Sequence, residues 1–143
     1  MFKMDLQVDG GKECVRELHE LDKAVRGRIS QRAVSAAVAV FVEPIRQKAP
    51  RRSGDLASSV ASRIRYYVRS GRVLAFAGPS YPQGAHGSII EGGTTSRFTA
   101  KGYYRGSGPA MPFAGPAFAE NVGQAESVLV SELRSGIEAE ASR

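Results

Sequence analysis

Two side chains in the middle of the chain could carry out acid–base chemistry. His86 and Glu91 lie five residues apart, and a histidine beside a carboxylate can act as general base and acid in a hydrolase. The remaining candidates for metal binding are Cys14 and His19. Structural zinc takes four cysteine or histidine ligands, so these side chains cannot form such a site. We therefore expect no metal and no other cofactor.

No wider catalytic motif accompanies these residues. The serines lack a GxSxG context, and the glycine-rich piece GSIIEGGTT is not followed by the GK[ST] of a phosphate-binding loop. Between residues 51 and 110 the only acids are Asp55 and Glu91, which disfavours chemistry by paired carboxylates. The sequence thus predicts that the chain is not an enzyme. A hydrolase using His86 and Glu91 is the weakest of three hypotheses.

A stronger pattern is the concentration of positive charge in the centre of the chain. The chain carries a formal charge of +6, and residues 51–110 contain 9 basic and 2 acidic side chains. An excess of this kind suits an anionic partner, either nucleic acid or an acidic protein surface. The residues that could contact DNA or a protein partner are Arg51, Arg52, Arg63, Arg65, Arg69 and Arg72, with Tyr103 and Tyr104 further along.

Two interpretations of this basic patch stay open. Arginines with an aromatic residue, Tyr67, among them could bind the phosphates of DNA without sequence preference. Alternatively, they could pair with the acidic C-terminal helix of a neighbouring subunit, because residues 111–143 carry 5 acids and 2 bases. We prefer the second interpretation, in which the chain forms a homo-oligomer, and keep non-specific contact with DNA as the alternative.

Helical and strand patterns indicate the elements that would position these residues. Residues 2–8 alternate apolar and polar side chains, which predicts a strand. Apolar residues at intervals of three and four predict helix over 12–48, divided near Gly27 and Ser30. Pro44 should kink this helix, and the Ala-Pro pair at 49–50 should end it.

The second half of the chain predicts a hairpin and a final helix. Residues 62–68 and 72–77 read as two strands, and Ser70-Gly71 is a plausible two-residue turn. Such a turn would place Arg69 opposite Arg72, which is unfavourable, and would put Leu74 and Phe76 on the arginine face. Either the turn is longer, or both sheet faces are covered in an assembly. Apolar spacing then predicts a helix from Pro116 to about residue 139. No apolar run approaches the roughly 20 residues of a membrane span.

A long segment rich in glycine and proline separates the hairpin from the last helix. Residues 78–116 contain 9 of the 16 glycines and 5 of the 7 prolines. Ordering some thirty such residues costs on the order of 30–60 kcal/mol. The segment is poor in aliphatic side chains, so we expect residues 79–115 to form an irregular interaction loop braced by other chains. The whole prediction is one α+β domain over 1–143, with a long N-terminal helical region and a C-terminal helix on a small antiparallel sheet.

Three separated motifs resemble one known family. The piece IRQKAPRRSGDLASSV is similar to its pattern of helix, Ala-Pro, Ser/Thr-Gly-x-Leu and strand. IIEGGTT is similar to its apolar-Glu-x-Gly-Thr, and PAMPFAGPAF to its Pro-Phe-x-x-Pro-Ala. The family is that of tailed-phage neck and tail-completion proteins, the "gene product ten-like" proteins, akin to the lambda minor tail protein Z group. The motif positions are Ala49, Pro50, Ser53, Gly54, Leu56, Glu91, Gly93, Thr94, Pro112, Phe113, Pro116 and Ala117.

The resemblance implies a structural virion protein at the head–tail junction, assembled in the host cytoplasm and acting without catalysis. Copies of the chain would form a ring, expected to be a hexamer, around the DNA channel. The implied partners are head-completion or connector proteins on one side and the tail terminator or tube protein on the other, with no membrane. We interpret the motif residues as determinants of the fold.

Overall fold

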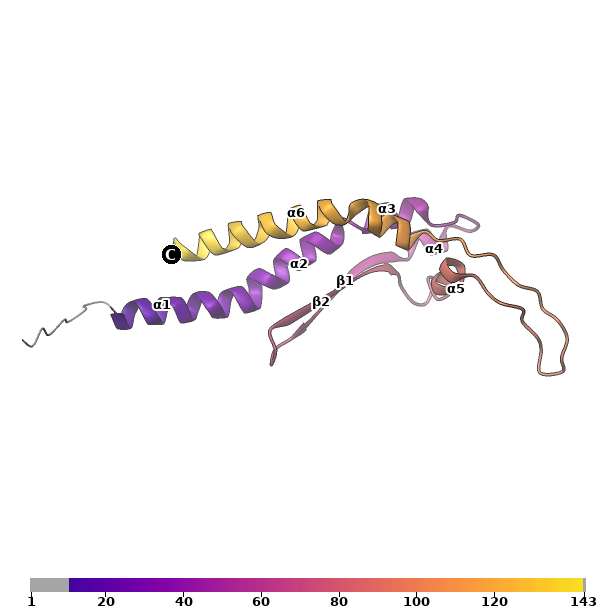
Figure 1. Cartoon of the computed structure of the whole chain (residues 1–143), viewed down its shortest axis with the longest axis horizontal. Coiled ribbons are helices and arrows are strands. Elements are labelled where there is room, and N and C mark those ends of the chain that lie inside the picture. The colour runs from indigo at the N-terminus through magenta and orange to yellow at the C-terminus, as the bar shows by residue number, and fades with distance from the viewer. Residues whose placement is uncertain (1–10, 143) are drawn as a thin grey trace, which may run out of the picture.

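The computed structural model describes residues 11–142, so the strand predicted over 2–8 lies outside the described residues. The N-terminal helical region begins with α1 (Gly11–Ala24) and continues through a π-helical turn, η1 (Val25–Ile29), into α2 (Ser30–Ala39). The predicted division near Gly27 and Ser30 therefore falls on η1. Figure 1 shows these elements as one long, bent rod.

The helix breaks a second time just before Pro44. Val40 and Phe41 form a turn, and α3 (Val42–Lys48) follows with Pro44 in its first helical turn. A proline ring clashes with the carbonyl of the residue four positions earlier, which here is Val40. The predicted kink is therefore a break located on the N-terminal side of the proline. Ala49 then takes an extended conformation and ends the helix, as expected of a residue that precedes proline.

The hairpin consists of β1 (Val60–Tyr67) and β2 (Arg72–Pro79), paired antiparallel. A four-residue loop, 68–71, joins them, so the two-residue turn is wrong and the longer alternative is correct. The longer loop places Tyr67 opposite Arg72, which avoids pairing Arg69 with Arg72 across the strands. Like charges directly opposite each other destabilise a sheet, and this is the physical reason for the longer loop.

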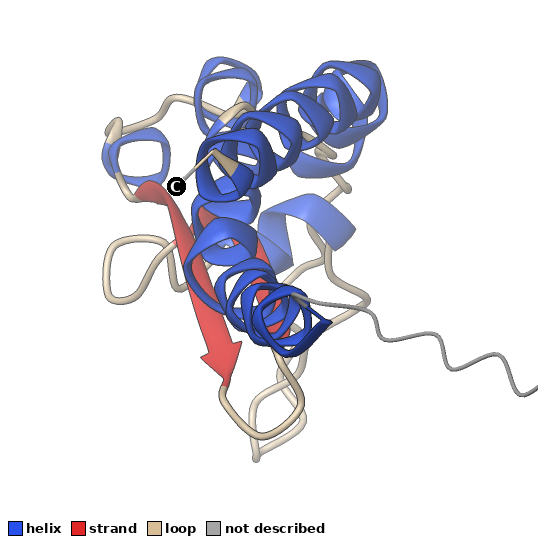
Figure 2. Cartoon of the chain, turned by 90° about the vertical axis from the view of Figure 1, so that its left-hand side faces the viewer, coloured by secondary structure: helices blue, strands red, loops and turns tan. Residues whose placement is uncertain are grey.

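Helix α2 lies between the final helix, α6 (Ala114–Ala141), and the hairpin. Figure 1 shows α6 above α2 and the two strands below it, and Figure 2 shows the same stack along the molecule's length. Residues 32–41 are rich in alanine and valine, and the small side chains let both neighbours approach. Ala33 is completely buried. At the far end of the contact, Gly136 leaves room for Ile29, since a Cβ there would lie 2.6 Å from the Ile29 side chain.

One apolar core joins the helices to the base of the hairpin. Its buried members are Val38, Phe41, Ile45, Ala49, Leu56, Ala57, Val60, Phe113, Ala117 and Ala125. The apolar stripe predicted over 12–48 is exposed at its start, where Val15 and Leu18 on α1 are 54% and 59% exposed, and Ile29 further along it is buried. The α+β class is confirmed, and that residues 1–143 form one domain stays a prediction.

The glycine-rich segment contains a helix that the sequence patterns did not predict. Helix α5 (Gly87–Gly92) lies under the core, where Ile90 packs against the buried cluster. Gly84 and Gly87 are both buried, and a Cβ on either would collide with Pro79. These two glycines therefore serve close packing of α5 against the end of β2. The prediction of an irregular loop over the whole of 79–115 is wrong for this part.

Candidate interaction surfaces

Glu91 joins the second and third sequence motifs by capping α6. Its carboxylate accepts hydrogen bonds from the backbone N–H groups of Phe113 (2.8 Å), Ala114 (2.9 Å) and Gly115 (2.9 Å). The first N–H groups of a helix have no partner within the helix, and a carboxylate there is favoured by the helix dipole. Partial burial alone would raise the pKa of Glu91, but the three donors outweigh burial and hold the pKa below its ordinary value.

The residues after Glu91 fasten the base of a projecting segment. Gly93 has a φ of +69°, and a Cβ there would lie 2.7 Å from the backbone nitrogen of Ala110. The Thr94 hydroxyl accepts a hydrogen bond from the Gly108 N–H at 2.8 Å. The Met111 N–H donates to the Ile90 carbonyl at 2.9 Å. The Glu-x-Gly-Thr motif thus closes a loop whose two ends are held side by side.

Between these ends, residues 93–112 form an arm that extends away from the body of the molecule (Figure 1). Thr94 and Gly108 exchange backbone hydrogen bonds, and Phe98 and Tyr104 form a second bridge. The rings of Phe98 and Tyr104 lie 5.5 Å apart. Gly102, with a φ of +81°, lies in the turn at the tip. The arm therefore pairs with itself, whereas the sequence predicted an irregular loop here.

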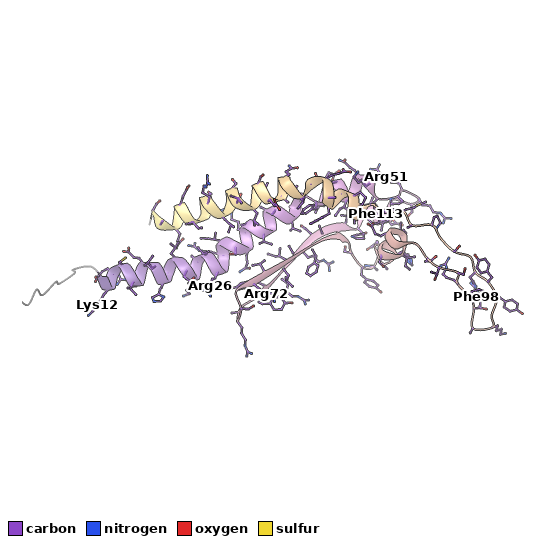
Figure 3. All side chains as sticks on the ribbon, in the orientation of Figure 1. Lys12, Arg26, Arg51, Arg72, Phe98 and Phe113 are labelled. Carbon is purple, nitrogen blue, oxygen red and sulfur yellow. The ribbon has the colours of Figure 1, made fainter. Side chains whose placement is uncertain are left out.

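The arm presents aromatic and cationic side chains to its surroundings. Phe98, Tyr103 and Tyr104 are 62%, 70% and 60% exposed, and Arg97, Lys101 and Arg105 alternate with them. Figure 3 shows Phe98 far from the core residue Phe113. Exposed aromatic clusters on a soluble protein mark contact sites. A hairpin could have been predicted here, since TTSRFT and YYRGSG flank the short turn AKG.

The first motif lies in the corner between α3 and β1. Ala49 and Leu56 are buried, whereas Ser53 lies in the exposed connection between α3 and the short helix α4 (Asp55–Ser58). Gly54 has a φ of +90° at the start of α4, a conformation that favours glycine. These residues shape the corner between the helical rod and β1.

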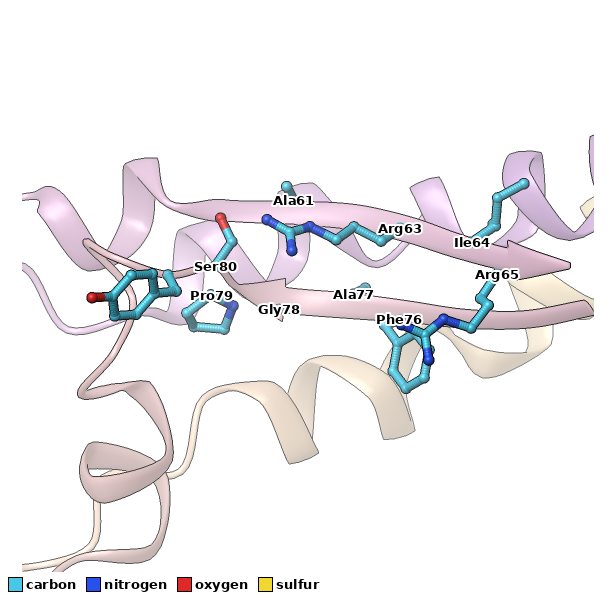
Figure 4. Close-up of a pocket in the computed structure, with 10 residues that line it drawn as sticks. Ala61, Arg63, Ile64, Arg65, Phe76, Ala77, Gly78, Pro79 and Ser80 are labelled. Atoms are coloured by element: carbon cyan, nitrogen blue, oxygen red, sulfur yellow. The ribbon is translucent and has the colours of Figure 1, made fainter.

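The predicted basic patch is divided in two. Arg63 and Arg65 lie on the outer face of the hairpin with Phe76 opposite Arg63 and Leu74 opposite Arg65. They border an open cleft of about 490 Å³ that continues to Tyr81 (Figure 4). Arg69 and Arg72 are at the hairpin's far end. Arg51 and Arg52 belong to the corner after α3, and Figure 3 shows Arg51 well separated from Arg72.

The acids of α6 are largely engaged within the chain. Glu120 pairs with Lys48 at 2.9 Å, Glu132 with Arg32 at 3.0 Å, and Glu140 with Arg28. Across residues 11–142, no acidic side chain forms an ion pair with the hairpin arginines. The expected pairing of those arginines with α6 of a neighbour is weakened, because Glu126 and Glu138 are the acids of α6 outside these three pairs.

His86 and Glu91 have separate roles in the fold. His86 is an exposed residue at the start of α5, whereas both carboxylate oxygens of Glu91 accept backbone N–H groups of α6. A general base needs a carboxylate or imidazole free to take up a proton. Glu91 is therefore a helix cap, and the hydrolase hypothesis loses the residue on which it depended.

A second groove is apolar and lies between β2 and the start of α6. Its lining includes Val38, Phe41, Ile45, Ala77 and Phe118, and it encloses about 450 Å³. Phe41 and Phe118 stack with their ring centres 4.9 Å apart. We call this feature the β2–α6 groove. No sequence pattern indicated it, because it depends on how far α6 stands from the edge of the sheet.

The chain is thus an elongated α+β protein with a projecting arm, an apolar groove and a basic sheet face. Comparison with protein families gives its class. A model described as "HK97-gp10_like: Bacteriophage HK97-gp10, putative tail-component" matches residues 12–93, more than half of the chain. The chain belongs to this family, and it is a structural component of a bacteriophage tail, located in the virion.

The family match confirms the resemblance given by the motifs. The matched residues include the first motif and Glu91 and Gly93 of the second, and they end at the first residue of the arm, before the third motif. No curated protein and no solved structure matches the chain. Within residues 11–142, none of the helices is both long and apolar enough to cross a bilayer.

Proposed function

We propose that the chain is a neck or tail-completion protein at the head–tail junction, where copies form a ring around the DNA channel. Six copies are expected. The ring joins head-completion or connector proteins to the tail terminator or tube protein, and the chain acts without catalysis. Family membership supports the general role. The observation that carries the finer role is the arm, which is anchored at its base and exposes its aromatic residues away from its own core.

The arm supports an assembly role because it has a fixed base and exposed aromatic side chains. Its base is fixed by Gly93, Thr94 and the Ile90–Met111 hydrogen bond. A fixed projection loses less conformational entropy on binding than a mobile loop does. Its exposed aromatics are the residue types enriched at the centres of protein interfaces. A free monomer gains nothing from holding such side chains in solvent.

Removing the chain from the phage tests this role. We expect cells infected with phage lacking the chain to accumulate DNA-filled heads and separate tails, because the junction cannot close. Electron microscopy of the lysate would show these separate heads and tails. Supplying the chain from a plasmid should restore joined particles. Joined, infectious particles without the chain would contradict the proposal, as would heads that fail to fill with DNA.

Contact with DNA is a second candidate function, favoured by the hairpin's outer face. From residue 56 to residue 119 the only acid is Glu91, and Glu91 is engaged in capping α6. The hairpin itself therefore carries no acidic side chain. Arg63 and Arg65 border a cleft that Tyr81 also lines. In a ring, this face could line the channel and contact phosphates.

Salt dependence tests the DNA candidate. Binding to duplex DNA should weaken with salt by a log–log slope of about −0.9 for each phosphate neutralised. Replacing both residues (Arg63→Ala with Arg65→Ala) should make the slope shallower by about 1.8. The matched control, Arg51→Ala with Arg52→Ala, removes the same charge from the separate corner and should change the slope little. Equal effects of the two pairs, or no measurable binding, would contradict contact through the hairpin.

A further inference from the structure

The β2–α6 groove has the features of a site for an extended segment. Strand β2 pairs with β1 along one edge, and no strand within residues 11–142 pairs along its other edge. A free strand edge offers unpaired N–H and C=O groups to another chain. The groove beside it is lined by apolar side chains, including Phe118, which is 54% exposed. Recognition by an added strand combines such backbone bonds with side-chain pockets.

The chain's own arm does not fill this groove. The arm leaves the body beyond α5 and extends away from the strands and from α6 (Figures 1 and 3). Its base is held by Gly93 and Thr94, so its direction is set by the fold. The molecule therefore carries an exposed aromatic projection and an open apolar groove that do not meet within one chain.

We propose that the arm of one copy occupies the β2–α6 groove of the next copy, with Phe98 and Tyr104 as the aromatic anchors. The charges of the two parts are complementary. The arm has three cations, Arg97, Lys101 and Arg105, and no acid. Helix α6 has 5 acids and 1 base, and Glu126 and Glu138 lie outside its three ion pairs with α2, α3 and η1. Basic side chains around an aromatic pair would thus approach a helix with these two acids of opposite sign.

This contact deepens the proposed ring and rests on it. Arm and groove are different surfaces of the same chain, so the contact is heterologous. Heterologous contacts produce closed rings when the rotation between neighbours closes, and open filaments when it does not. The arm-to-groove contact, repeated between successive copies, would therefore be sufficient to form the ring.

Cross-linking between cysteines tests the contact directly. In a Cys14→Ser background, one preparation carries Ser96→Cys on the arm and a second carries Ala75→Cys in the groove. Both positions are exposed, and neither change removes an aromatic anchor. The two are mixed with the tail proteins and oxidised. A disulfide needs Cα atoms within about 7 Å, so we expect a linked dimer only from this mixture. The control pairs Ser96→Cys with Val130→Cys, an exposed position of α6 outside the groove.

The possible results separate this inference from the proposed function. Ring assembly with the arm–groove disulfide supports both. Ring assembly without that disulfide, or with the groove cysteine linked to a different tail protein, overturns the arm–groove contact and leaves the ring intact. Failure of the chain to self-associate with its tail partners overturns both.

Loss of the anchors provides a second readout. Replacing Phe98 and Tyr104 with alanine together should raise the concentration needed for half-maximal assembly at least tenfold. Tyr81→Ala removes an aromatic that is 82% exposed but lies outside the arm, and it should leave that concentration unchanged. Equal assembly by the arm variant and the Tyr81 variant would overturn the contact.

Discussion

Replacing Phe113 with alanine is expected to destabilise the chain more than any other single change considered. Phe113 is 1% exposed and packs in the core where α6 begins. Truncating a buried phenylalanine to alanine typically costs about 3–5 kcal/mol, through lost transfer free energy and the cavity left behind. Small domains have only about 5–15 kcal/mol of total stability. The variant should therefore unfold at a much lower urea concentration, measured by circular dichroism.

A matched phenylalanine on the arm supplies the control. Phe98 is 62% exposed and contacts Tyr104 at the edge of the fold, so Phe98→Ala should cost less than about 1 kcal/mol. If the two variants unfolded at the same urea concentration, the packing described for the start of α6 would be wrong. A large effect confined to Phe113→Ala would place this residue at the centre of the core, joining α6 to β1.

The second large effect is expected at Glu91. Glu91→Gln removes the negative charge that accepts the three N–H groups of Phe113, Ala114 and Gly115. A hydrogen bond to a charged group contributes about 1.5–3 kcal/mol to the free energy of unfolding. Here three such bonds share one carboxylate. We expect a loss of about 2–3 kcal/mol at pH 7, measured by urea unfolding. Glu126→Gln, on the exposed face of the same helix, should change stability little.

The same residue predicts a dependence of stability on pH. The folded-state pKa of Glu91 is lowered, whereas the unfolded value is about 4.3. A lowered folded pKa contributes stability that is fully present above the unfolded pKa and is lost as pH falls through the folded pKa. The natural chain should thus lose more stability than Glu91→Gln between neutral and strongly acidic pH. Parallel stability curves for the two proteins would show that the carboxylate does not cap α6.

Short-range patterns in the sequence predicted the elements well. The spacing of Leu21, Val25 and Ile29 and the alternation around Arg63 and Arg65 correspond to the helical rod and to β1. Proline chemistry also gave the stop at Ala49-Pro50 and indicated a kink at Pro44, where the structure has a break just before the proline. These features depend on residues within a few positions of one another, so they are readable without knowing the three-dimensional contacts.

Contacts between distant residues could not be read in the same way. Glu91 lies more than twenty residues before the N–H groups that it accepts, and the motif alone did not indicate the cap. The glycine-rich segment suggested an irregular loop because ordering the backbone of many glycines costs conformational entropy. Gly84, Gly87 and Gly93 instead allow the backbone to approach Pro79 and Ala110 closely.

The basic patch also shows that residues near in sequence need not lie together in the structure. Arg51 and Arg52 were grouped with the hairpin arginines because they are near in sequence, yet α4 and the length of β1 separate them from Arg69 and Arg72. The apolar spacing over 12–48 predicted a helix, and Val15 and Leu18 at its start are exposed in the single chain. Burial of such a stripe depends on what packs against it, and the sequence pattern does not specify the partner.

Cryo-electron microscopy of the intact particle tests the central proposal most directly. The measurement is the location, copy number and arrangement of this fold in the density between head and tail. The account predicts a closed ring of six copies at the head–tail junction, with the DNA channel at its centre and the arm of each copy reaching its neighbour. Finding the chain absent from the junction, or present there only as isolated copies that do not contact one another, would contradict it.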